Sequence, residues 1–123
     1  MTDTSFQPVL YVKHGCPFCL KVRLFALEAG ILDDIVVREF THGSAEELAI
    51  RQELVGVVEK LSFPAALLAP GRYVTESDVI IAELAAISGR DPDALPVYQT
   101  YAADVLPSLV KLYRENQALK SVA

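Results

Sequence analysis

The chain has 123 residues, a length typical of one domain, and a chain of this size can bury a core without disulfide or metal cross-links. Hydrophobic residues make up 52% and charged residues 22%, which excludes a disordered chain. Acidic residues outnumber basic ones by 16 to 11, and Lys and Arg are scattered singly along the sequence. This charge pattern argues against nucleic acid as a partner.

Two further features bear on location. Residues 1–8 are polar and lack the basic and apolar regions of a secretory leader, so none is expected. The longest apolar stretches, 64–69 and 79–87, are much shorter than the ~20 residues that span a bilayer. Glu83 also interrupts the second stretch. We therefore expect a cytoplasmic protein with no membrane partner.

The two cysteines, Cys16 and Cys19, are separated by two residues. A secreted disulfide scaffold would have more cysteines at wider spacing. His14 and His42 are poorly placed to complete a structural zinc site, so no metal is expected at this pair. In a reducing compartment an isolated C-x-x-C pattern favours redox chemistry, with two inert core cysteines as the alternative.

The first half of the chain alternates strand and helix signals. β-Branched and aromatic residues over 8–13 and 35–40 predict two strands. Between them, apolar residues at helical spacing over 18–29 predict a helix, with Pro17 in its first turn.

A capping-box pattern opens the next part, in which Ser44 caps a helix over 45–60 and Glu47 reaches back. An apolar segment over 64–69, a Pro-Gly turn and a short segment over 72–74 predict a strand hairpin.

Two helical segments follow the hairpin. The first is predicted to begin with Thr75 or Ser77 as its cap and to end at 88–89. The second covers 95–119, and Pro107 is expected to kink or split it. Its apolar residues recur every three or four positions and predict an apolar stripe: Val97, Tyr101, Val105, Leu109 and Leu112. We also expect three tyrosines of this segment to be packing residues: Tyr98, Tyr101 and Tyr113.

The element order is therefore β-α-β-α-β-β-α with a C-terminal helical extension. It predicts an α/β fold, a mixed four-stranded sheet flanked by helices, in which the first βαβ unit is parallel and the hairpin antiparallel. We expect residues 1–90 to form this domain and residues 91–123 to be a helical extension of the same domain.

The C-x-x-C pair lies at a predicted strand-to-helix junction, and this position predicts its chemistry. Unpaired N–H groups and the dipole at the start of the helix favour a thiolate at Cys16. The ammonium group of Lys13 could approach the same sulfur, and Cys19, one helical turn further, should be more shielded. We predict Cys16 as the nucleophile and Cys19 as the resolving thiol of a disulfide exchange. A zinc or iron–sulfur site shared between two protomers is a further alternative.

The segment Lys13-His14-Gly15-Cys16-Pro17-Phe18-Cys19 resembles the active-site segment of glutaredoxins and of the N-terminal domains of cysteine-type glutathione transferases. Ser62-Phe63-Pro64 resembles the cis-proline segment of the thioredoxin superfamily. Glu76-Ser77-Asp78 resembles the segment that holds the γ-glutamyl carboxylate of glutathione. The three motifs occur in the expected order, and the resemblance, which covers residues 8–89, implies a thioredoxin-like (glutaredoxin-like) fold.

The resemblance also implies a function, a glutathione-linked thiol-disulfide oxidoreductase. Glutathione would be a cosubstrate, no cofactor would be tightly bound, and the other partners would be protein disulfides or glutathionylated proteins. Catalysis is assigned to Cys16, Cys19 and Lys13. Glutathione binding is assigned to Lys13, Phe18, Phe63, Pro64, Glu76, Ser77 and Asp78. The backbone of Phe63 would pair with the cysteinyl part, Ser77 would hold the γ-glutamyl carboxylate at a helix start, and Asp78 or Glu76 would face the α-amino group.

Two other classes of function stay open. Glu76-Ser77 is closer to the glutathione transferase pattern and favours a domain that binds or conjugates glutathione. Residues 95–123, however, hold about one helix of the all-helical second domain that those transferases carry. The other class is a non-enzymatic module, such as a scaffold, a homodimer formed through the apolar last helix, or a carrier of a metal cluster.

Overall fold

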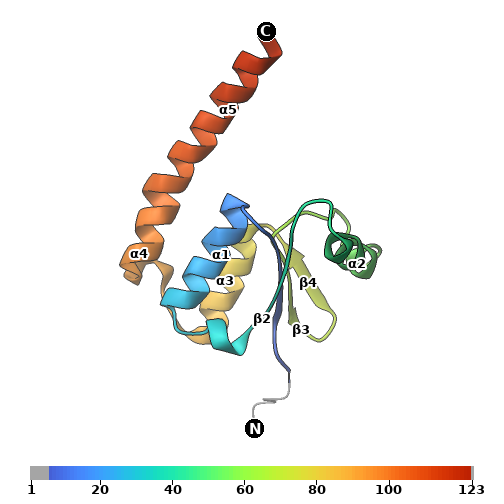
Figure 1. Cartoon of the computed structure of the whole chain (residues 1–123). Helices are drawn as coiled ribbons and strands as arrows, with labels where there is room; N and C mark the ends of the chain where they lie inside the picture. The colour runs from blue at the N-terminus through green and yellow to red at the C-terminus, as the bar shows by residue number, and fades with distance from the viewer. Residues whose placement is uncertain (1–5, 123) are drawn as a thin grey trace.

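A computed structural model describes residues 6–122 of the chain, so the first part of the polar segment 1–8 lies outside the described residues. Its centre is a four-stranded sheet in the order β2-β1-β3-β4 (Figure 1). The strands are β1 Val9–Lys13, β2 Val36–Phe40, β3 Ala65–Ala69 and β4 Arg72–Thr75. β1 pairs with β2 in parallel, whereas β1–β3 and β3–β4 are antiparallel. The mixed, thioredoxin-like sheet expected from the sequence is confirmed.

Helices cover both faces of the sheet (Figure 1). α1 Pro17–Glu28 and α3 Ser77–Ser88 pack on one face, and α2 Ala45–Leu54 packs on the other. A short 3-10 turn, η1 Leu32–Asp34, leads from α1 toward β2. Side chains of β1 alternate between the two faces, as strand geometry requires. Leu10 and Val12 therefore join the core under α1 and α3, and Tyr11 joins the smaller core under α2.

The start of α2 is capped as predicted, with one change of partner. The backbone N–H of Glu47 donates to Ser44 Oγ at 3.2 Å. The Glu47 carboxylate, however, accepts from the N–H of Gly43 at 2.7 Å, because the N–H of Ser44 already donates to the Thr41 carbonyl. The predicted end of this helix at residue 60 is wrong. α2 ends at Leu54, where β-branched valines and a glycine with φ 88° at position 56 follow.

The start of α3 differs from the prediction. Neither Thr75 nor Ser77 is the cap, because Thr75 is still paired to Ala65 in the sheet and Ser77 is the first helical residue. Glu76 stands at the cap with φ 73° and ψ 123°, a conformation rare for a residue with a side chain. The helix ends as predicted, with Gly89 in the left-handed conformation.

The C-terminal extension is irregular just before Pro107 but is not split, because Gln99, Thr100 and Leu106 all keep right-handed helical backbone angles. After the 3-10 turn η2 Pro92–Ala94 come α4 Pro96–Gln99, a π-helical segment η3 Thr100–Val105, and α5 Leu106–Val122. Pro107 has no N–H and its ring crowds the preceding turn, which fits the widened turn just before it. α5 extends well beyond the sheet and its helices (Figure 1).

The extension is attached to the domain through α1. The Glu28 carboxylate accepts the backbone N–H groups of Val97 at 3.1 Å and Tyr98 at 2.6 Å, and so caps the start of α4. The ring of Tyr98 packs edge-on against Phe25 at 5.5 Å, which confirms its packing role. Tyr113 is 61% exposed, so the prediction that it packs is wrong. No helix among residues 6–122 is long and apolar enough to cross a membrane.

Candidate functional site

The sheet register brings the three motifs to one end of the domain. Tyr11, near the end of β1, pairs with Ala65 at the start of β3, and Ala65 pairs with Thr75 at the end of β4. The cysteine turn follows β1, the Phe63-Pro64 peptide precedes β3, and α3 begins after β4. Segments separated by about 60 residues in the sequence therefore meet at one edge of the sheet.

The cysteine pair lies where β1 passes into α1. Both cysteines are free thiols, Cys16 half-buried and Cys19 only 1% exposed. Cys16 is the cap residue of α1, with extended backbone angles, and Pro17 is the first helical residue as predicted. Gly15, with φ 78°, turns the chain between the strand and the helix. The backbone N–H of Lys13 donates to Cys19 Sγ at 3.4 Å.

The environment makes the two thiols unequal. The pKa of Cys16 is lowered to about 6, first by a hydrogen bond from the Cys19 thiol, against the opposing effect of burial. Backbone N–H groups of Cys19 and Phe18 and the charge of Lys13 lower this pKa further. The pKa of Cys19 is strongly raised, because its thiol donates that hydrogen bond and because it is buried. Cys16 is therefore the thiolate near neutral pH, and Cys19 keeps its proton.

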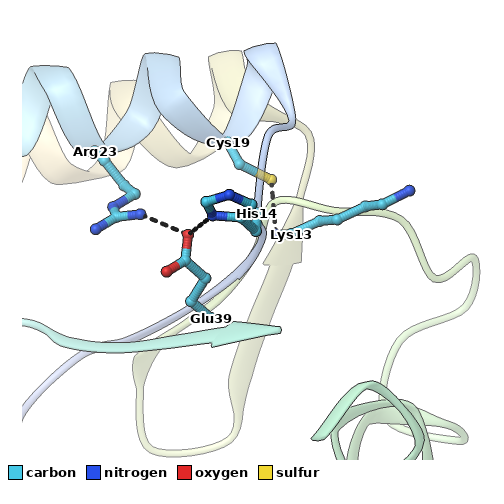
Figure 2. A network of polar contacts seen from close by, with 5 residues as sticks. All are labelled: Lys13, His14, Cys19, Arg23 and Glu39. Carbon is cyan, nitrogen blue, oxygen red and sulfur yellow. Dashed lines mark hydrogen bonds and ion pairs between the residues drawn. The ribbon is translucent and has the colours of Figure 1, made fainter. Parts of the chain in front are cut away.

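A cavity of about 350 Å³ lies beside the two thiols. Three polar side chains on its wall form a network (Figure 2), in which Glu39 Oε2 accepts from Arg23 at 3.0 Å and faces His14 Nδ1 at 3.3 Å. Sequence reasoning missed Arg23 and Glu39. Arg23 could have been found by helical spacing, since it follows Cys19 by four residues on α1, and Glu39 by its place near the end of a parallel strand.

Tyr101 closes another part of this cavity. Its hydroxyl donates to the carbonyl of Pro17 at 2.7 Å. Burial raises the pKa of Tyr101, and the charge of the neighbouring Cys16 raises it further. The predicted packing role of Tyr101 thus includes a hydrogen bond that ties η3 to the first turn of α1.

The Phe63-Pro64 peptide is cis, as the resemblance implies, and Pro64 is fully buried. The Phe63 ring packs edge-on against Phe40 at 4.7 Å, and the Arg51 guanidinium lies 5.2 Å from its centroid. The ring is thus held on the α2 side, which positions the backbone at the start of β3.

The start of α3 carries the three residues of the predicted γ-glutamyl segment. Ser77 is buried at 8% exposure and is the first residue of the helix, and Glu76 is exposed. The Asp78 carboxylate, predicted as one of two groups to face an α-amino group, forms an ion pair with the Lys21 ammonium of α1. The Asp78 side chain is 86% exposed and that of Lys21 is 12% exposed, so one face of this carboxylate is open.

Phe18 does not line the cavity beside the thiols. It is 42% exposed and lines an apolar cavity of about 640 Å³ between the cysteine turn and α5. Leu109, Val110 and Tyr113 line the other side of this cavity, and Arg114 lies at the same wall. Among residues 6–122 no group of three or more His, Cys, Asp or Glu side chains is arranged to hold a metal ion.

Comparison with known proteins places these motifs in a family. None of the curated proteins matches the chain. The solved structure of glutathione transferase Omega 2C from Trametes versicolor is similar, with a TM-score of 0.43 and 20% identity, over 76% of this chain and 40% of that chain. The present chain thus spans less than half the length of that protein. The family model for the glutathione S-transferase N-terminal domain matches residues 15–87. This match covers more than half of the chain, which therefore belongs to the family of glutathione S-transferase N-terminal domains.

Proposed function

We propose that the chain is a glutathione-linked thiol-disulfide oxidoreductase in which Cys16 is the nucleophile and Cys19 the resolving thiol. The observation that carries the proposal is the asymmetry of the two thiols at the start of α1. Cys16 is accessible and its pKa is lowered to about 6, whereas Cys19 lies behind it with a raised pKa. This is the arrangement that a two-step disulfide exchange requires. A reducing compartment such as the cytoplasm suits such a pair.

In the first step the Cys16 thiolate attacks the glutathione sulfur of a glutathionylated protein. The protein thiolate leaves and takes a proton from solvent, and glutathione stays on Cys16 as a mixed disulfide. In the second step Cys19 attacks the Cys16 sulfur and releases glutathione, which leaves a Cys16–Cys19 disulfide. Alternatively, a second glutathione attacks the bound glutathione sulfur, which yields glutathione disulfide and the Cys16 thiolate.

Glutathione would bind across the sheet edge described above. We assign the backbone of Phe63 to its cysteinyl part and the start of α3 at Ser77 to its γ-glutamyl carboxylate, because helix N–H groups favour an anion. The exposed carboxylates of Glu76 and Asp78 are assigned to the α-amino group. Asp78 can take this role while paired to Lys21, since a carboxylate accepts several hydrogen bonds.

Reduction of a glutathionylated peptide by glutathione tests the proposal. Cys16→Ser should abolish the activity, and Cys19→Ser should keep at least part of it through the route that uses a second glutathione. Ser77→Ala should raise KM for glutathione more than it lowers kcat, because it removes a binding group and no reacting atom. A Cys16→Ser variant as active as the wild type would refute the function.

A second candidate, conjugation of glutathione to an apolar electrophile, is favoured by one observation. The apolar cavity of about 640 Å³ opens beside Gly15 and Pro17, next to the reactive thiol. Conjugation of 1-chloro-2,4-dinitrobenzene that persists in Cys19→Ser but is lost in Ser77→Ala would support this candidate over disulfide exchange.

A further inference from the structure

In the proposed function, on which the inference about this step rests, the resolving step requires that Cys19 transfer its proton to an acceptor. Cys19 is 1% exposed and keeps its proton in the reduced protein, where its thiol donates to the Cys16 thiolate. Once Cys16 carries a mixed disulfide, that thiolate is gone, and Cys19 must lose its proton before or as it attacks. On its α3 side Cys19 belongs to an apolar core with Ile80, Ile81 and Leu84, which offers no proton acceptor.

The cavity beside the thiols is the other direction in which the proton can leave. Besides the two cysteines, five titratable or charged side chains line it: Lys13, His14, Arg23, Glu39 and Tyr101. Lys and Arg are donors without an acceptor atom, and the Tyr101 hydroxyl is committed to the Pro17 carbonyl. The acceptors that remain are the imidazole of His14 and the carboxylate of Glu39.

These two groups are already joined. A carboxylate can only accept, so His14 Nδ1–H is the donor to Glu39 Oε2 at 3.3 Å. In the neutral form of the ring, this leaves a lone pair on Nε2 that can take up a proton. Arg23 holds the same carboxylate oxygen at 3.0 Å (Figure 2). The Lys13 side chain points away from this network. The His14 side chain is 71% exposed, so a proton on Nε2 can pass to solvent.

The geometry points to His14 as the proton acceptor for Cys19 in the resolving step, with Glu39 as its positioning residue. The Cys19 proton passes through the cavity to His14 Nε2, and the Cys19 sulfur then forms a bond to the Cys16 sulfur. The bond from Cys16 to the departing sulfur breaks, and the departing thiolate leaves with the electron pair. The charge of Arg23, which lowers the pKa of Cys19, stabilises the thiolate as it forms. His14 later returns its proton to solvent or to the released thiolate.

Stoichiometric reaction of the reduced protein with 5,5′-dithiobis(2-nitrobenzoic acid) separates the two steps. Attack by Cys16 releases the first coloured thiolate in a bimolecular phase, and attack by Cys19 releases the second in a unimolecular phase. Cys19→Ser should abolish the second phase. His14→Ala should leave the first phase within about twofold and slow the second at least about 100-fold, the low end for loss of a general base. Added imidazole should restore part of the second phase in His14→Ala, an effect that a structural role would not produce.

The chain offers a matched control in His42, which also faces a glutamate, Glu47, at 3.7 Å but does not line the cavity. His42→Ala should leave both phases unchanged. Glu39→Asp, which keeps a carboxylate, should retain more of the second-phase rate than Glu39→Gln. An unchanged second phase in His14→Ala, or a slowed one that imidazole does not restore, would overturn the inference alone. Loss of the first phase in the wild type would overturn the proposed function and this inference with it.

Discussion

The hydrogen bond between the two thiols should set the acidity of Cys16, and Cys19→Ala removes it. In the structure the Cys19 thiol is the first cause of the lowered pKa of Cys16, ahead of the backbone N–H groups and of Lys13. Burial of Cys16 acts in the opposite direction. In Cys19→Ala the hydrogen bond that stabilises the Cys16 thiolate is lost while burial still disfavours it, so the pKa of Cys16 should rise.

The size of the rise follows from the value of one hydrogen bond to a charged group, about 1.5–3 kcal/mol. Since one pKa unit corresponds to about 1.4 kcal/mol, the loss is worth about one to two units. The pKa of Cys16 should therefore move from about 6 to between about 7 and 8. At pH 6 the thiolate fraction of Cys16 would fall from about one half to about one tenth or less.

The pH dependence of the rate of alkylation by iodoacetamide measures the pKa of Cys16 directly. A range from pH 4 to 10, about six units, brackets the values expected for the wild type and for Cys19→Ala. Cys19 is buried and keeps its proton, so Cys16 dominates the wild-type rate. Cys19→Ser is the matched control, because its hydroxyl can still donate to the Cys16 thiolate and should give a smaller shift. A Cys19→Ala midpoint equal to that of the wild type would refute the reasoning, as would a wild-type midpoint near that of an ordinary cysteine, ~8.5.

Three further predictions concern stability, each measured as the free energy of unfolding in urea. Reduced wild type should gain stability as pH rises from about 6 to ~8.5, because unfolded Cys16 binds a proton that the folded thiolate lacks. Above that range stability should fall, because only folded Cys19 keeps its proton. Leu54→Ala should cost about 2–5 kcal/mol, since Leu54, the last residue of α2, is 0% exposed. Leu48→Ala in the same helix, at a site 60% exposed, should change stability by less than ~0.5 kcal/mol. Glu76→Gly should stabilise by about 1 kcal/mol, because glycine adopts φ 73° without steric cost, and an unchanged or lower value would mean that the Glu76 side chain has compensating contacts.

The strands and helices were predictable where the signal is local. Runs of β-branched and aromatic residues, Pro17 at a helix start and Gly89 past a helix end act within a few residues, and the strands and helix ends that they predict are observed. The cap of α3 was mispredicted because hydroxyl preference at caps competes with sheet pairing. Thr75 pairs across the sheet with Ala65, so the chain can turn only at Glu76. Glu76 has φ 73°, a backbone angle that a glutamate in the sequence does not predict.

The thiol pair could be predicted because spacing and helix position carry its chemistry. The ion pairs that its charged neighbours form could not be predicted, although the positions of Arg23 and Glu39 could have been, since each of these contacts joins different elements. Arg23 and Glu39 are 16 residues apart, and Lys21 and Asp78 are 57 apart. No period or motif in the sequence encodes such pairs. They depend on the register of β2 beside β1 and on the packing of α1 against α3.

The last helix shows what periodicity does and does not determine. The stripe of apolar residues predicted for the extension is real, but Val97, Val105, Leu109 and Leu112 are between 43% and 61% exposed. Spacing reveals an apolar face and not what that face contacts. Here part of the apolar face lines the cavity of about 640 Å³ beside the cysteine turn. Leu109 of this face also lines the cavity beside the two thiols. Tyr101, which belongs to the same extension, donates a hydrogen bond to the Pro17 carbonyl at the start of α1. The segment after residue 90 therefore helps to build the thiol site.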